Sequence, residues 1–322
     1  MRKLIGLGTA LAAFIGLSTA AGAAEVTLRA VSAFQPGTLF SLNFERFVKR
    51  VNEQGKGVVQ IQFIGGPSAM PTFEIGNALR NGVVDMANTT AVFHANLVPE
   101  GVALTLAERP IAELRKNGGY DLMNGIHQKK ARIFWLGRAA ENMEYHIYLS
   151  KVPDSPDMKG KKLRSVPTYQ SFFTALGATP MQIAPGEVYT ALERGVVDGY
   201  GWPSGGVFDL GWQEKTKARV EPGFYQVETG IFVSLTSWNN KLDDAQRTFL
   251  KEQMAWLEGE NAAFATIAAD EKEKQAKAGI EAYTLPPQDA TKFLEMAREA
   301  GWKAVIGASP EDGPKLRQLF TK

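Results

Sequence analysis

Two stretches of the chain repeat one another, and together they decide the fold. Residues 187–198 are Glu-Val-Tyr-Thr-Ala-Leu-Glu-Arg-Gly-Val-Val-Asp, and residues 74–85 are Glu-Ile-Gly-Asn-Ala-Leu-Arg-Asn-Gly-Val-Val-Asp. Seven of the twelve positions are identical at a constant offset of 113 residues, the difference between 187 and 74. Glycine- and proline-containing segments at 65–67 and 177–180 precede the two copies in the same order. This agreement favours an internal duplication over a chance match of common residues.

Each copy is predicted to fold as a helix, a glycine turn and a strand. The apolar residues of each copy share one helical face. Gly82 and its counterpart Gly195 suit the left-handed conformation that ends many helices. The valine pairs at 83–84 and 196–197 are then expected to begin short buried strands.

The segments upstream of the two copies extend this pattern. Apolar periodicity predicts strands at 26–33, 58–64, 147–150 and 162–165, and helices at 38–54 and 168–176. Each half is therefore predicted as a β-α-β-α-β unit, which implies a mostly parallel sheet covered by helices. Two such units predict an α/β protein with two lobes, and a ligand cleft beyond the carboxyl ends of the strands.

The last part of the chain is predicted to be helical and to brace both lobes. Residues 243–277 are mainly helix formers, and a further helix is expected at 288–302 after two prolines. Coil between 95 and 115 and near residue 220 is expected to cross between the lobes. The chain is expected to divide into a mainly first lobe, a mainly second lobe and a bracing C-terminal part, at residues 25–145, 146–240 and 241–322.

Residues 1–24 have the features of a cleavable signal peptide. Arg2 and Lys3 precede an apolar stretch from Leu4 to Leu17, and small residues at 21–23 precede the expected cleavage site. The apolar stretch is short for a membrane anchor, although an uncleaved anchor is the alternative. Because no cysteine is present, a lipid anchor at this site is excluded. These features predict export to the periplasm.

Composition excludes several classes of site. The chain of 322 residues is 44% hydrophobic and 22% charged, which is ordinary for a globular protein of about two domains. Without cysteine, disulfides, thiolate metal sites and cysteine nucleophiles are excluded, and the three histidines lack zinc-motif spacing. Beyond residue 24 the chain has 34 basic residues (36 minus Arg2 and Lys3) and 34 acidic residues. This balance gives no electrostatic reason to expect nucleic-acid binding.

The motifs between residues 158 and 199 resemble a known transport family. Lys159-Gly-Lys-Lys-Leu-Arg164, Gly177-Ala178, Pro180-Met181 and the second repeat through Gly199 follow one another in the order and spacing found there. The family is the solute-binding subunits of tripartite ATP-independent periplasmic (TRAP) transporters, of DctP type. Segments between 65 and 86 fit the same family, and the resemblance extends over about residues 26–300.

The resemblance implies a periplasmic-binding-protein clamp that captures an organic acid. In such systems the clamp delivers its ligand to a membrane permease driven by an ion gradient, commonly of sodium. No cofactor is implied. A monomer is the expected state, and the long C-terminal helix leaves a dimer open.

The family's most constant ligand residue is the arginine that ends the Lys-Gly-x-Lys-x-Arg motif, here Arg164. A guanidinium matches a carboxylate with two parallel hydrogen bonds, and the helix predicted after it adds positive potential. From spacing alone, a surface arginine or a structural ion pair is the alternative. Trp202 is expected to be a stacking wall for the ligand, as in relatives that bind keto acids; a core tryptophan is the alternative.

Four residues of the first lobe are further candidates. The duplication pairs Asn88 and Thr89 with the residues that follow the second valine pair, so they are expected to offer neutral hydrogen bonds to a ligand. Simple strand capping is the alternative. Phe34 and Gln35 follow the first predicted strand and should also reach the cleft, although a core position for Phe34 is equally open.

Glu144 is the last candidate, because relatives place a ligand-facing residue about twenty positions before the arginine. It could accept a hydrogen bond from a ligand hydroxyl or amine, with Arg138 and Tyr145 as nearby substitutes and a surface glutamate as the alternative. Some relatives carry a metal-assisting carboxylate just before the tryptophan. Here that residue is Gly201, so no metal is expected.

Two other functions remain open on the sequence. A secreted two-lobed enzyme would lack support, since no Gly-x-Ser-x-Gly elbow, metal cluster or phosphate loop is present. A binding protein of an ATP-driven importer would share the clamp but not the 159–199 pattern. A single basic anchor beside Trp202 favours a monocarboxylate with an aromatic or aliphatic body over a dicarboxylate.

Overall fold

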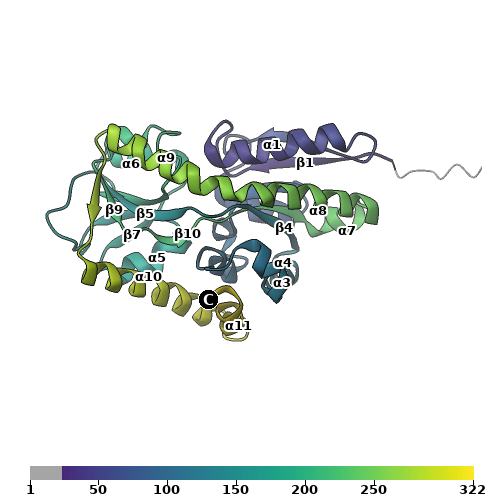
Figure 1. Ribbon diagram of the computed structural model, residues 1–322. Coiled ribbons are helices and arrows are strands. Elements are labelled where there is room, and N and C mark those ends of the chain that lie inside the picture. The colour runs from purple at the N-terminus through teal and green to yellow at the C-terminus, as the bar shows by residue number, and fades with distance from the viewer. Residues whose placement is uncertain (1–23) are drawn as a thin grey trace, which may run out of the picture.

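The protein has two lobes joined by long helices (Figure 1). A computed structural model describes residues 24–322. The predicted signal peptide at residues 1–24 therefore lies outside the described residues, apart from Ala24.

The first lobe is built on a five-stranded sheet in the order β2-β1-β3-β11-β4. Its strands are β1 (Val26–Ser32), β2 (Val59–Gly65), β3 (Met86–Thr89), β4 (Ile133–Ala140) and β11 (Thr229–Ser234). β1 runs parallel to β2 and β3, whereas β11 is antiparallel to β3 and β4. The helices of this part are α1 (Leu39–Gln54), α2 (Ile75–Arg80), α3 (Ile111–Asn117), α4 (Gly119–Ala131) and α7 (Leu235–Asn240).

The second lobe is built on a seven-stranded sheet in the order β12-β9-β5-β8-β6-β7, with β10 paired to β5. Its strands are β5 (Glu144–Leu149), β6 (Lys162–Ser165), β7 (Thr179–Gln182), β8 (Gly199–Pro203), β9 (Ala218–Glu221), β10 (Phe224–Gln226) and β12 (Glu281–Thr284). β6 is parallel to β7 and β8, whereas β5 is antiparallel to β8 and β9. The helices are α5 (Pro167–Ala175) and α6 (Val188–Glu193).

The structure confirms that the two halves share one unit. The parallel strands β2-β1-β3 of the first sheet correspond to β7-β6-β8 of the second, with α1 and α2 matching α5 and α6. Gly82 (φ 70°) and Gly195 (φ 65°) adopt the predicted left-handed conformation. The expectation that the valine pairs begin the strands is wrong, because the chain must first leave this turn before it can pair. Val83 and Val196 are exposed, and pairing starts two to three residues later.

The prediction of mostly parallel sheets holds for three strands of the first sheet and, in the second, for the matching three strands and for the parallel pair β9 and β12. Each sheet continues with an antiparallel strand beside the last parallel one: β11 beside β3, and β5 beside β8. β11 falls inside residues 146–240, yet it completes the first sheet, so the lobes exchange strands where the chain crosses. Sequence periodicity does not report strand direction, and the exchange was therefore not predicted.

The chain crosses between the sheets at residues 141–143, between β4 and β5, and at 227–228, between β10 and β11. The two crossings are side by side, since Val227 N donates to Met143 O at 2.7 Å. The expected crossing between 95 and 115 is wrong, because this segment forms short helical turns and the start of α3 within the first lobe.

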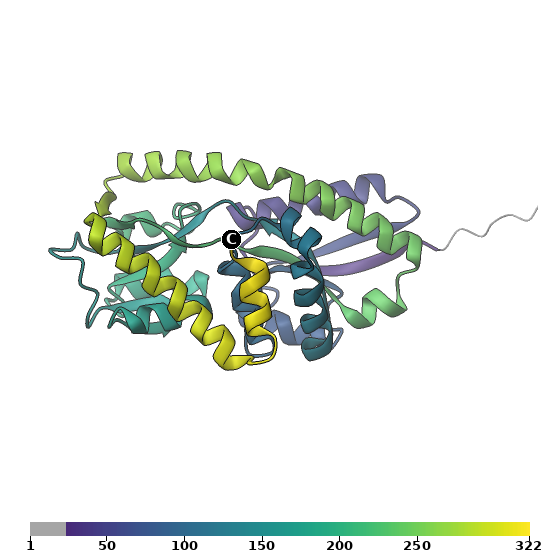
Figure 2. The ribbon, with the colours of Figure 1, turned by 60° about the horizontal axis from the view of Figure 1, so that its bottom comes forward.

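The C-terminal helices join both lobes, as the sequence predicts. α8 (Asp244–Gly259) packs on β4 and α1 of the first lobe, and α9 (Ala263–Lys277) continues alongside the second after one helical turn (Figure 1). α10 (Pro287–Ala308) packs on α5 and on the 99–105 turn of the first lobe, and α11 (Gly313–Phe320) ends on the first lobe (Figure 2). No helix among residues 24–322 is long and apolar enough to cross a membrane.

The lobes are closed on one another, because one hydrophobic core passes through both. Phe40 of α1 lies 6.2 Å from the ring of Trp202 in β8 and stacks on Phe264 of α9 at 6.4 Å. Asp209 of the second lobe also accepts a hydrogen bond from Leu39 N, the first residue of α1, at 2.7 Å. Polar and aromatic contacts thus join the lobes at the mouth of the cleft.

Candidate ligand-binding site

Arg164 lies near the carboxyl end of β6, the strand that the sequence predicts at 162–165, and the residue is fully buried. Nε donates to the carbonyl of Ile183 at 2.9 Å, and Nη1 donates to the carbonyl of Gly201 at 3.1 Å. Nη2 has no partner among residues 24–322. The two carbonyls fix the plane of the guanidinium and leave one of its nitrogens free to bind a further acceptor.

No carboxylate of the described chain lies within ion-pair distance of this guanidinium, although most buried arginines are paired. Its surroundings are aromatic: the ring of Trp202 lies 5.5 Å from the guanidinium carbon, and burial lowers the pKa of Arg164 to about 10. The tyrosines Tyr169, Tyr145 and Tyr200 oppose this shift. The group is still charged at neutral pH, so the fold holds an uncompensated cation in an apolar setting.

A small cavity of about 20 Å³ lies in front of Arg164. Its walls are largely aromatic and aliphatic and come from both lobes and from the crossing strands. They comprise Phe34, Phe40, Val92, Phe93, Tyr145, Val166, Tyr169, Trp202, Pro203 and Val227. The remaining lining residues are Thr90, Glu228 and Thr229. The cavity therefore combines one free cationic nitrogen, one carboxyl group and a large apolar wall.

An outer chamber of about 240 Å³ adjoins this cavity. Phe34, Phe40 and Trp202 line both, so these three rings form the wall between them. Gln35 and Asp209 line only the outer chamber. The outer chamber leads toward the contact between Asp209 and α1, which closes the mouth of the cleft.

Among the predicted site residues, the structure brings Arg164, Trp202 and Phe34 together around one cavity. Asn88 and Thr89 are fully buried but do not line it. The amide of Asn88 donates to Ser32 Oγ at 3.1 Å and to the carbonyl of Phe40 at 2.8 Å, which ties β3 to the start of α1.

Glu144 does not lie at the Arg164 cavity. It is the first residue of β5, where consecutive side chains point to opposite faces, and its neighbour Tyr145 faces the cavity instead. Burial raises the pKa of Glu144, with Lys272 opposing and Glu221 adding to the shift. The expectation that Glu144 faces the ligand is therefore dropped.

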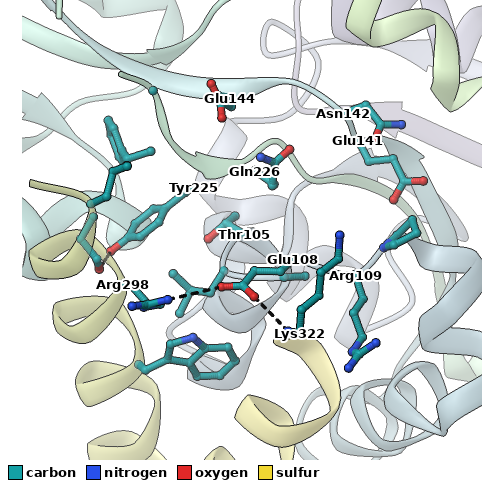
Figure 3. A pocket seen from close by; sticks show the side chains of 18 of the residues that line it. Thr105, Glu108, Arg109, Glu141, Asn142, Glu144, Tyr225, Gln226, Arg298 and Lys322 are labelled. Carbon is teal, nitrogen blue, oxygen red and sulfur yellow. Dashed lines mark hydrogen bonds and ion pairs between the residues drawn. The ribbon is translucent and has the colours of Figure 1, made fainter. Parts of the chain in front are cut away.

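Glu144 lines a larger cavity of about 810 Å³ between the crossing strands and α10 (Figure 3). Its charged groups are mostly paired within the protein: Glu108 accepts from Lys322 N at 2.9 Å and lies 4.0 Å from Arg298 (Figure 3). Arg138 is paired with Glu141 at 3.2 Å. This cavity is the larger of the two, but the buried cation without a partner, Arg164, lines the smaller one.

Gly201 has a steric role beside the arginine. A side-chain carbon at this position would lie 2.8 Å from the ring of Tyr169 and 3.0 Å from that of Phe173. Since both rings are buried, no side chain fits there without displacing the cavity wall. Only the carbonyl of Gly201 is available, and it already accepts from Arg164.

The chain matches known binding proteins in sequence and in fold. Residues 149–305 match the model of bacterial extracellular solute-binding protein family 7, DctP. A monocarboxylate 2-oxoacid-binding periplasmic protein of Nostoc is 23% identical over 246 residues, which cover 72% of this chain and 66% of the relative.

Solved structures of binding proteins have the same fold. A TRAP periplasmic solute binding protein of Desulfovibrio salexigens with bound orotic acid superposes with a TM-score of 0.81 at 19% identity, covering 91% of this chain and 97% of that one. One of Ralstonia eutropha with bound (S)-2-acetolactate gives 0.77 at 21% identity, covering 91% and 98%. Residues 149–305 therefore belong to the DctP family, and the chain as a whole has the fold of the TRAP solute-binding proteins.

Sequence reasoning missed part of the lining of the Arg164 cavity. Phe40 and Tyr169 lie in predicted helices, and the position of Tyr169 in the first turn after Arg164 could have suggested its role. Phe93 and Glu228 carry no sequence signal, because one lies in a short 3-10 helix and the other at the 227–228 crossing, several residues beyond the one expected near residue 220.

Trp202 lies in a strand and is only 7% exposed, with its ring 4.6 Å from that of Trp212. Replacing it with alanine should lower the affinity for ligand by about 1–3 kcal/mol, because a large apolar wall is lost. Since the ring also packs between the lobes, stability should fall by about 3–5 kcal/mol, as for core aromatic truncations. Calorimetric titration and urea unfolding of the same variant measure both quantities.

Trp202→Phe is the matched control, since it keeps a ring in contact with Phe40 and should lose less of each quantity. Unchanged affinity in a destabilised Trp202→Ala protein would show that the ring serves the core alone.

Proposed function

We propose that this TRAP solute-binding protein captures an organic acid between its lobes and that Arg164 holds the carboxylate of the ligand. The observation that carries the proposal is the buried guanidinium with a free Nη2 and no protein carboxylate beside it. A buried unpaired charge is costly, and a carboxylate ligand would compensate it with charge-assisted hydrogen bonds.

The walls of the cavity favour a compact monocarboxylate. Orotic acid and (S)-2-acetolactate, the ligands of the two structural neighbours, each carry one carboxylate on a small body. The inner cavity of about 20 Å³ has room for about one water molecule. A ligand would therefore enter when the lobes separate, and the rings of Phe34, Phe40 and Trp202 would re-pack around it.

The role is transport rather than catalysis. We infer that the protein is exported by its N-terminal segment, works as a monomer in the periplasm, and delivers its ligand to the membrane subunits of a TRAP system. The family to which it belongs consists of extracellular binding proteins.

Native mass spectrometry of the purified protein tests this function. We expect one organic acid per chain, released chemically unchanged on denaturation, and a thermal shift when that acid is added back to the stripped protein. A protein that carries no acid, and is stabilised by none in a panel of mono- and dicarboxylates, would contradict the proposal. Conversion of the acid during incubation would instead favour an enzyme.

A further inference from the structure

Glu228 lies at the crossing between β10 and β11, at the base of the cleft, and is fully buried. Its Oε2 accepts two hydrogen bonds from the segment that follows β3: one from Thr90 Oγ1 at 2.7 Å and one from the backbone N–H of Ala91 at 3.1 Å. The carboxyl group is thus held rigidly by the first lobe.

The second carboxyl oxygen is free. Oε1 of Glu228 is buried and has no partner among residues 24–322, and Glu228 lines the same cavity as Arg164. The two charged groups do not form an ion pair with each other. Arg164 of the second lobe and Glu228 of the crossing segment therefore line one small cavity, and each carries a buried polar atom without a partner, which is costly.

The backbone N–H of Ala91 determines which carboxyl oxygen of Glu228 is available to a ligand. Because the N–H of Ala91 can only donate, Oε2 must act as an acceptor, and Oε1 is the atom that remains for the ligand. Thr90 already donates to Glu228, and the other polar groups of the lining are neutral: the hydroxyls of Thr229, Tyr145 and Tyr169 and the indole N–H of Trp202. Glu228 is therefore the one carboxyl group that the described residues contribute to this lining.

We propose that Glu228 selects organic acids that carry a hydrogen-bond donor, a hydroxyl or an ammonium group, which binds Oε1 while the carboxylate binds Arg164. This inference rests on the proposed function of Arg164 and names the class of ligand within it. A ligand that bridges the two groups satisfies both in one step, whereas an acid without a donor leaves the carboxyl oxygen unpaired and is rejected.

The protonation state of Glu228 determines whether its free oxygen accepts or donates a hydrogen bond. Burial raises its pKa, and the bonds from Thr90 and Ala91, together with Arg138, oppose that shift. If a proton were retained it would have to sit on Oε1, which would then donate to a ligand carbonyl instead. A preference for oxo acids would therefore overturn the inference.

Titration calorimetry with two sets of acids, each set sharing one carbon skeleton, tests the inference. The probes are 2-hydroxy-, 2-amino- and 2-oxo-propanoate and the corresponding 3-methylbutanoates. We expect the hydroxy or the amino acid to bind at least tenfold more tightly than the oxo acid of the same skeleton. Which of the two binds better separates a hydroxyl ligand from an ammonium ligand.

Glu228→Gln changes the hydrogen-bonding group that faces the cavity. The amide oxygen of the new side chain must face Ala91 N–H, so its NH₂ group faces the cavity and replaces an acceptor by a donor. We expect the variant to lose at least tenfold in affinity for the hydroxy and amino acids and to gain affinity for the oxo acid. Glu144→Gln, at the separate cavity of Figure 3, is the matched control and should leave the order unchanged.

A wild-type protein that binds the oxo acid as tightly as its analogues, or binds none of the six probes, overturns the inference. If Glu228→Gln fails to fold, the order of preference of the wild-type protein still decides. If carboxylate binding is weakened in Arg164 variants but unchanged in Glu228→Gln, this inference alone fails. If binding is unchanged in Arg164 variants, the proposed function fails.

Discussion

Replacing Arg164 with methionine should weaken ligand binding by at least about 2 kcal/mol, roughly thirtyfold, because the ligand carboxylate loses its only charge-assisted partner in the cavity. Arg164→Lys should also bind poorly, since an ammonium group cannot reproduce the planar fork that the carbonyls of Ile183 and Gly201 orient.

The same methionine variant should be more stable than the wild-type protein without ligand. Folding lowers the pKa of Arg164 to about 10, because burial disfavours its charged form. At neutral pH, below the pKa of the folded and of the unfolded state, the guanidinium is charged in both states, and the cost of burying it is about 3 kcal/mol. Methionine removes this cost but leaves two carbonyls without their donor, at about 1 kcal/mol each. We expect a net gain of about 1–2 kcal/mol.

Urea unfolding and calorimetric titration of wild-type, Arg164→Met and Arg164→Lys proteins measure both effects. Affinity should fall in both variants, and stability should rise in the methionine variant only. A methionine variant that is less stable than wild type would show that the guanidinium supports the fold rather than the ligand. Such a result would remove the central argument for the site.

Lowering the pH from 7.5 to 5 should destabilise the protein strongly, because all three histidines are buried. Burial lowers the pKa of His127 and of His146 to about 4, and burial together with His127 lowers that of His94 well below its usual value. The Nδ1–H groups of His127 and His146 lie 3.0 Å from backbone carbonyls, consistent with neutral rings. Glu221, 3.5 Å from His146, opposes the shift but does not outweigh burial.

The direction of the change in stability follows from the number of protons bound by the folded and the unfolded protein. Between about pH 6.5 and pH 4 the unfolded histidines bind protons and the folded ones do not, so stability is complete above pH 6.5 and is lost as the pH falls. Each histidine contributes about 2 kcal/mol between pH 7.5 and 5, and the three together about 4–6 kcal/mol. Buried carboxyl groups with raised pKa, such as Glu228 and Glu258, act in the opposite direction and offset part of this loss.

Thermal unfolding at the two pH values measures the effect, and we expect Tm to be about 10–15 °C lower at pH 5. His146→Gln is the matched variant, because an amide can still donate to the carbonyl of Val220 and does not titrate. Its loss of stability over the same range should be about one third smaller. Equal stability at both pH values would mean that the histidines are protonated in the fold.

The sequence was sufficient to predict the duplicated unit and the anchor of the site. The repeat around Gly82 and Gly195 depends on local physics, since a glycine turn and helical periodicity are properties of neighbouring residues. The strand that ends at Arg164 and the helix after it are likewise where they were predicted, within one residue. The wall position of Trp202 followed from its place after the second repeat.

Only the tertiary structure decided the rest, because it depends on contacts between segments far apart in the chain. The strand exchange of β5 and β11 places Tyr145 rather than Glu144 at the cavity. Consecutive side chains of a strand point to opposite faces, so only one of these two neighbours faces the cavity. The same exchange brings Glu228 opposite Arg164, 64 residues earlier in the sequence. The sequence by itself identified Arg164 as the proposed anchor, and the fold decided which residues lie around it, since direction and pairing of distant strands leave no local pattern.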